Sequence, residues 1–122
     1  MREQLMIQTD RVYCIQRTAQ GVVCTVNGGT DSGRPLPLRL DLWNHSPTGF
    51  EFGYGGSGPA QLALAILADC CGDELAVQYH QAFKWAVIAR IPGPGGSLTG
   101  TFVRDVLAKL QADRAAQNCH NN

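Results

Sequence analysis

The sequence predicts a single α+β domain in which a small antiparallel sheet of about four strands packs against about three helices. Before Ser57, short runs of strand-type alternation are separated by turn-forming residues, and after it apolar residues recur at helical spacing. The links between the expected strands are too short for helical crossovers, which predicts antiparallel pairing. The 122 residues, 44% of them apolar, suffice for one core. We assign residues 1–110 to the domain and 111–122 to a polar tail that we expect to fray.

Four segments in the first half of the chain have strand character. Arg11–Arg17 and Gly21–Val26 are rich in β-branched and aromatic residues and predict a hairpin. Leucines alternate with other residues over 36–42, which predicts a half-buried third strand, and Pro37 indicates an edge strand or the start of a strand. Phe50–Tyr54 predicts a fourth strand. Turn-forming residues fill the loops between these segments, at 27–33 and 44–49.

Three helices are predicted in the second half of the chain. The first, with Ser57 as N-cap, is apolar on nearly every side from Pro59 to Cys70 and should be buried. The second covers 74–90 and should face the core with Leu75, Tyr79, Ala82, Phe83 and Ala86. A Pro-Gly linker at 92–96 separates it from the third, which is capped by Thr99 and has an apolar face formed by Phe102, Val103, Val106, Leu107 and Leu110.

Composition excludes several classes of protein. Ten basic and ten acidic residues give a formal net charge of zero, so we do not expect nucleic acid as the main partner. The longest apolar run, Leu62–Ala68, is far shorter than the roughly 18 residues of a membrane span, and the N-terminus does not resemble a signal peptide. We therefore expect a cytoplasmic protein without membrane association. The five cysteines have no C-x-x-C spacing, so we expect neither a metal nor another cofactor.

The glycine-rich turn Gly53–Pro59 is the most distinctive motif in the chain. A strand, a glycine-rich turn and a helix form the arrangement that binds anions, because free N–H groups point outward from a helix N-terminus. No Lys or Arg follows these glycines, and the only acidic or basic residues between Arg39 and Lys84 are Asp41, Glu51, Asp69, Asp73 and Glu74. We therefore interpret the glycines mainly as residues that allow close packing.

A catalytic interpretation of the same turn is weaker. Ser57 follows a strand and begins a helix, as hydrolase nucleophiles do, but Pro59 replaces the last glycine of the G-x-S-x-G motif. His45 and His80 could each serve as a base. Single residues of these types occur in most domains, so we assign no catalytic residue and expect a protein that is not an enzyme.

The second helix has a further apolar set, offset from its core stripe, that consists of Val77, Gln81, Trp85 and Ile88. If no other element covers this set, Trp85 is the kind of aromatic anchor that centres protein interfaces. The alternative, which we favour from sequence alone, is that the third helix packs there. Basic residues concentrate on the second and third helices, and this uneven charge suits oriented docking onto a protein partner.

The segments from Trp43 to Leu67 and from Tyr79 to Trp85 resemble a small family of uncharacterised proteins encoded by bacteria, phages, plasmids and integrated elements. The run Gly53-Tyr54-Gly55-Gly56-Ser57-Gly58-Pro59, followed by Ala60-Gln61-Leu62-Ala63-Leu64, is the most specific part of the resemblance. The family has no assigned activity, so the resemblance supplies no catalytic residue. It implies the setting of a mobile element, where small proteins often bind and block a host machine.

The leading hypothesis is a non-enzymatic accessory protein of a phage or mobile element that binds a protein partner. Inhibition of a host defence system such as CRISPR would be one form of that role. The expected binding residues are His45, Tyr54, Gly55, Gly56, Ser57, Gln61 and Trp85. Self-association into a homo-oligomer also stays open. The alternative is a small-molecule or nucleotide-binding enzyme that uses the Gly-rich turn at the helix N-terminus.

Overall fold

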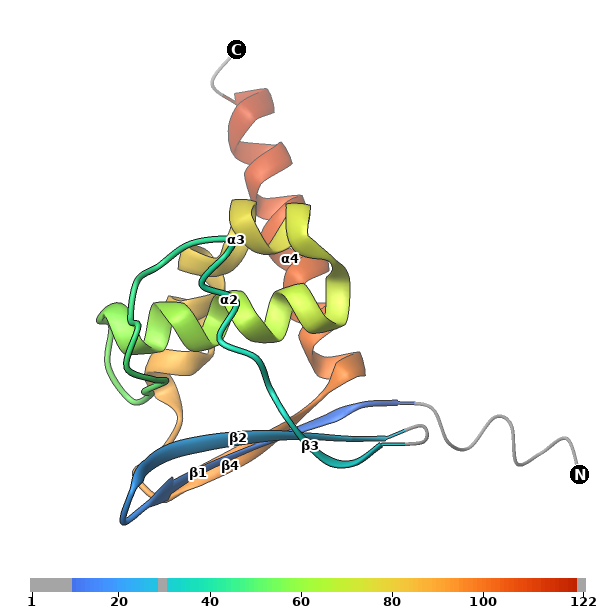
Figure 1. The fold of residues 1–122 in the computed structure, drawn as a ribbon. Coiled ribbons are helices and arrows are strands. Elements are labelled where there is room, and N and C mark those ends of the chain that lie inside the picture. Colours follow the sequence, from blue (N-terminus) through green and yellow to red (C-terminus); the bar gives the residue numbers. More distant parts are fainter. Residues whose placement is uncertain (1–9, 29–30, 121–122) are drawn as a thin grey trace, which may run out of the picture.

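A computed structural model describes residues 10–28 and 31–120 and shows one sheet with three helices stacked on one of its faces (Figure 1). The strands are β1 (Val12–Thr18), β2 (Gly21–Gly28), β3 (Asp31–Pro35) and β4 (Gly95–Thr99), and their order across the sheet is β3-β2-β1-β4. All three pairings are antiparallel. The helices are α2 (Ser57–Cys71), α3 (Asp73–Ala86) and α4 (Gly100–His120), with a 3-10 turn η1 (Ile88–Arg90) after α3. The predicted α+β class is confirmed.

Helix α2 lies between the sheet and the other helices, as its uniformly apolar sequence predicts (Figure 1). Every residue from Gly58 to Ala68 is buried. The core combines inward side chains of the strands with side chains of all three helices, among them Tyr13, Ile15, Val26, Leu62, Leu64, Ile66, Phe83 and Val103. The predicted N-cap is wrong by one residue: Gly56 occupies the cap position without a side-chain hydrogen bond, and Ser57 is the first helical residue.

The first hairpin is confirmed, but the two other predicted strands are wrong. The alternating segment 36–42 is irregular because Arg39 has a φ of 59° and the N–H of Leu42 closes a turn onto its carbonyl. Its apolar residues still pack on the core, which explains the misleading period of two. Phe50–Tyr54 forms only one isolated bridge, between Val22 and Phe50.

The true edge strands lie in segments that were predicted to be loops. β3 begins inside the expected loop 27–33 and ends two residues after it, at Pro35. β4 begins inside the predicted linker 92–96 and continues to Thr99. β4 pairs with β1 at Gly95, whose φ is +123° and where a Cβ atom would collide with the carbonyl oxygen of Ile15. Glycine is therefore required for this close approach of two strands. The Pro-Gly composition that predicted a linker therefore includes a glycine that the strand β4 requires.

The last two helices differ from expectation at their ends. α3 ends at Ala86 rather than Arg90, because Val87 leaves the helical conformation before η1. The Thr99 hydroxyl accepts a hydrogen bond from the N–H of Phe102, in the manner of the predicted cap. α4 continues through the tail segment as far as His120, and beyond the helical layer it projects away from the domain (Figure 1).

Asp69 joins the C-terminal end of α2 to the sheet. Its carboxylate accepts hydrogen bonds from Arg11 (2.7 Å), Tyr13 (2.8 Å) and Arg34 (3.1 Å), and the Asp69 side chain is only 14% exposed. Burial alone would raise the pKa of Asp69, but the hydrogen bonds of Tyr13 and Arg11 outweigh it and lower that pKa. The carboxylate therefore stays ionised and ties the central helix to two strands.

We expect Asp69→Asn to lower the free energy of unfolding by about 2–3 kcal/mol, because it removes the negative charge that pairs with Arg11 and Arg34 and replaces one accepting oxygen by an NH2 group that cannot accept. Urea denaturation at pH 7 measures this loss. Asp105→Asn, at an exposed position of α4, is the matched control and should change stability by less than about 0.5 kcal/mol. Equal stability of the two variants would contradict the assigned role of Asp69.

Candidate functional site

The irregular segment between β3 and α2 places an aromatic stack against α3. The ring of Trp43 is stacked on His45, with centroids 5.1 Å apart and planes inclined by 12°. The same indole contacts His80 of α3 with centroids 5.3 Å apart. The Nε2 atoms of the two histidines are 2.9 Å apart, within hydrogen-bond distance. This contact joins the loop to the helix.

The direction of the histidine hydrogen bond follows from the backbone around His80. Its Nδ1 atom lies 3.0 Å from the carbonyl oxygen of Ala76 and 3.1 Å from that of Val77, so Nδ1 must carry a proton. In the neutral ring Nε2 is then the acceptor, and Nε2 of His45 is the donor. Protonation of both rings would place two N–H groups face to face, so the pair holds at most one positive charge without breaking.

Both histidines are held in the neutral form. Burial lowers the pKa of His45 from 6.5, and the charges of His80 and Lys84 lower it further. Burial also lowers the pKa of His80, against the opposing effect of its hydrogen bonds to the carbonyls of Ala76 and Val77. Near neutral pH the pair is therefore a structural contact without charge.

Gln61 of α2 fixes the loop from below. Its Oε1 accepts the backbone N–H groups of His45 (2.8 Å) and Ser46 (2.9 Å). Its Nε2 donates to the carbonyl oxygens of Leu38 (2.7 Å) and Trp43 (3.0 Å). Gln61 has no exposed surface. Gln61 was expected to bind a partner directly, but it lies beneath the surface and instead positions the backbone of Trp43 and His45.

The glycines of the turn before α2 are covered by side chains. A Cβ atom at Gly55 would overlap the indole of Trp85, and one at Gly56 would lie 2.6 Å from the ring of Tyr54. One at Gly58 would lie 2.6 Å from the Cβ atom of Glu51. These contacts are those of a packed turn, and they favour the close-packing interpretation over an anion cradle. Ser57 is exposed at the start of the helix.

Helix α3 is rotated from the predicted orientation, and this rotation exposes Trp85. Its buried residues are Ala76, His80, Phe83 and Lys84, whereas Ala82 and Ala86 of the expected stripe are exposed. Trp85 is 57% exposed, so the interpretation that another helix covers it is wrong. Of the offset set, only Ile88 is buried. Polar His80 and Lys84, spaced four residues apart, share the inward side.

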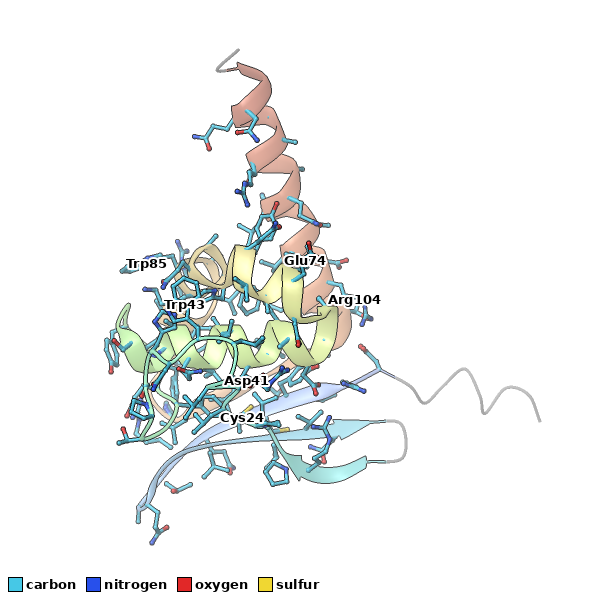
Figure 2. All side chains as sticks on the ribbon, turned by 45° about the horizontal axis from the view of Figure 1, so that its top comes forward. Cys24, Asp41, Trp43, Glu74, Trp85 and Arg104 are labelled. Carbon is cyan, nitrogen blue, oxygen red and sulfur yellow. The ribbon has the colours of Figure 1, made fainter. Side chains whose placement is uncertain are left out.

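Three exposed aromatic residues from distant parts of the sequence surround the glycine-rich turn and α3. Trp43, Tyr54 and Trp85 are 47%, 52% and 57% exposed, and we call the surface that they form the aromatic face. Contacts run from Trp43 to His80, along α3 to Trp85 and on to Gly55, next to Tyr54. Figure 2 shows Trp43 and Trp85 on the same side of the molecule, away from the sheet.

Sequence reasoning missed two of the residues that build this site. Trp43 lacked a role because it falls between the predicted strand 36–42 and the predicted loop 44–49, and Lys84 was counted only among the basic residues of the helices. The spacing of His80 and Lys84 in phase with Ala76 could have identified a partly polar inner stripe. Lys84 lies with its ammonium 4.7 Å from the ring centroid of Trp85, a cation–π contact.

The two cysteines of the first hairpin do not face each other. Strand register pairs Cys14 with Thr25 and Cys24 with Ile15, so the two cysteines lie on opposite faces of the sheet. In residues 10–28 and 31–120, no group of three or more His, Cys, Asp or Glu side chains could hold a metal ion. None of the helices in this described part is long and apolar enough to span a bilayer.

The fold and the site define a small α+β domain with a solvent-exposed aromatic face. The chain belongs to a family of unknown function (DUF6166), whose model matches residues 13–115. No curated protein and no solved structure matches the chain. The family therefore supplies no activity, and arguments about function depend on the geometry of the site.

We expect Gln61→Leu to lower the free energy of unfolding by about 3 kcal/mol or more, because it leaves four backbone groups of the loop without partners. Chemical denaturation measures the effect. The matched control is Gln78→Leu, at an exposed position of α3, which should alter stability by less than about 0.5 kcal/mol. A loss below about 1 kcal/mol for the Gln61 variant would show that the loop does not depend on this side chain.

The lowered pKa values of the two histidines predict a loss of stability in mild acid. Above pH 6.5 both rings are neutral in the folded and unfolded chain, so their contribution is complete. As the pH falls below 6.5, the unfolded chain binds protons that the folded chain resists, and the free energy of unfolding declines. Urea denaturation at pH 7, 6 and 5 should show a smaller decline for His45→Gln. Identical declines for the variant and the wild type would contradict this assignment.

Proposed function

We propose that this chain is a non-enzymatic protein that docks onto another protein through the aromatic face. The observation that carries the proposal is the position of the Trp85 indole across Gly55, which joins the glycine-rich turn and the exposed side of α3 into one surface. The glycine-rich turn and the Trp85 side of α3, which the sequence offered as separate candidate surfaces, are in contact here. Tryptophan and tyrosine are the residues that most often dominate binding energy at protein interfaces.

The rigidity of the face supports docking. Trp43 is held by two ring contacts, and the backbone beneath it is fixed by Gln61. Trp85 extends from a regular helix and lies against the turn. Aromatic side chains that are already ordered lose little conformational entropy when a partner binds, so more of the contact energy contributes to affinity.

The setting that we propose is a phage or mobile element, with a host protein as the partner. A defence complex such as a CRISPR effector is one candidate target, because a rigid domain can block a surface without performing chemistry. The family resemblance supports this setting.

We expect affinity capture from a bacterial lysate to recover the same protein with wild-type bait and with Phe102→Ala bait, but not with Trp43→Ala or Trp85→Ala bait. Phe102 is 43% exposed on α4 and is the matched control for truncation of an exposed aromatic residue. Circular dichroism confirms that each bait is folded. Equal recovery by all four baits, or specific recovery by none, would contradict docking through the aromatic face.

Gly55→Ala provides a second variant of the face. The added methyl group would overlap the outer edge of the Trp85 indole, which is exposed and can swing away. We expect recovery of the partner to fall as it does for Trp85→Ala, while the free energy of unfolding changes by less than about 1 kcal/mol. Gly93→Ala, where a Cβ atom meets nothing within 4 Å, should leave both unchanged. Wild-type recovery by Gly55→Ala would argue against a role for the indole in its observed position.

A further inference from the structure

Lys84 is a buried cation without a counterion. The residue is only 7% exposed, and its ammonium is 4.7 Å from the ring centroid of Trp85. Among the residues that the structure describes, no hydrogen-bond acceptor and no carboxylate pairs with this ammonium. A cation–π contact is worth about 0.5–2 kcal/mol and does not replace the hydrogen bonds to water that burial removes.

Three of the acidic residues between Arg39 and Lys84 pair with arginines. Asp41 and Asp73 both pair with Arg39, at 3.0 and 2.9 Å, and Glu51 pairs with Arg17 at 2.9 Å. The region that appeared acidic from composition is therefore largely neutralised by arginines. The C-terminal end of α3 supplies only about half a negative charge to Lys84.

The ammonium is not completely enclosed. No fully buried side-chain nitrogen or oxygen among the described residues lacks a hydrogen-bond partner. Because the ammonium has none, it must keep some contact with solvent. Most of Lys84 is thus buried, and its ammonium keeps a small contact with solvent beside Trp85.

We propose that Lys84 binds a carboxylate of an acidic peptide segment in the partner protein, while apolar side chains next to that carboxylate pack on Trp43 and Trp85. This inference rests on the proposed docking function and specifies the chemistry of the partner. A single lysine among aromatic side chains suits a carboxylate flanked by apolar groups. A free phosphate would require more donors than this surface offers, because Nε2 of His45 already donates to His80.

A selection from a displayed library of random 12-residue peptides tests the partner chemistry. The wild-type protein should enrich peptides that contain Asp or Glu next to apolar residues, and Lys84→Met should not enrich the acidic residues. Enrichment without acidic residues would overturn this inference and leave docking intact. Enrichment of the same peptides by the wild type and by a Trp43→Ala, Trp85→Ala double variant would overturn the docking function itself, and with it this inference.

Titration of the protein with the most enriched acidic peptide, monitored by tryptophan fluorescence, measures how much Lys84 contributes to the affinity. We expect Lys84→Met, or replacement of the peptide's acidic residue by its amide, to weaken binding by about tenfold or more. Lys109→Met, at an exposed position of α4, should bind as the wild type does. Lys84→Met replaces the aliphatic stem with one of similar length and should stay folded, which circular dichroism checks. Unchanged affinity in Lys84→Met, or an equal fluorescence response to inorganic phosphate alone, would overturn the assignment.

Discussion

The hydrogen bonds of Gln61 are the constraint on which the exposed surface depends. An irregular segment runs from β3 to α2 and carries Trp43 and His45, and apart from the isolated bridge at Phe50 it belongs to no sheet or helix. One buried side chain on α2 satisfies four of its backbone groups. Because α2 is buried between the sheet and the other helices, the position of the loop is coupled to the core. The stability of the domain thereby fixes the geometry of the aromatic face.

The site combines groups that are costly to bury with groups that are costly to expose. His80 and Lys84 occupy inward positions of α3, where apolar residues would pack without loss of hydration. Trp43 and Trp85 are exposed, where smaller polar residues would avoid contact of large apolar surface with water. Local conflict of this kind is expected at functional sites, since selection for stability alone would remove it. A partner that covers the indoles and supplies a carboxylate would resolve both conflicts.

The sequence predicted the fold class, the first hairpin and the buried central helix, because each has a strong local signal. It failed at the sheet edges. The alternating leucines of 36–42 pack on the core from a loop, and β4 begins at Gly95, in a segment that has linker composition. Edge strands depend on pairing with distant residues, which local propensity does not record.

The glycine-rich turn with Tyr54 and Gly55 was predicted as one surface and Trp85 as another, but the contact between Trp85 and Gly55 requires the tertiary fold. The same holds for the burial of Gln61 and the isolation of Lys84, which depend on where other elements place backbone groups and carboxylates. These features become visible only when the loop, the turn and α3 are seen together.

The indole N–H resonances provide the most direct test of the central claim, because the chain has only two tryptophans, Trp43 and Trp85, and both lie on the aromatic face. In a ¹⁵N–¹H correlation spectrum, each gives one isolated signal. If the face docks a protein partner, addition of the captured partner should shift or broaden both signals. If both signals keep their positions and widths while the partner is bound, the docking surface lies elsewhere and the account is contradicted.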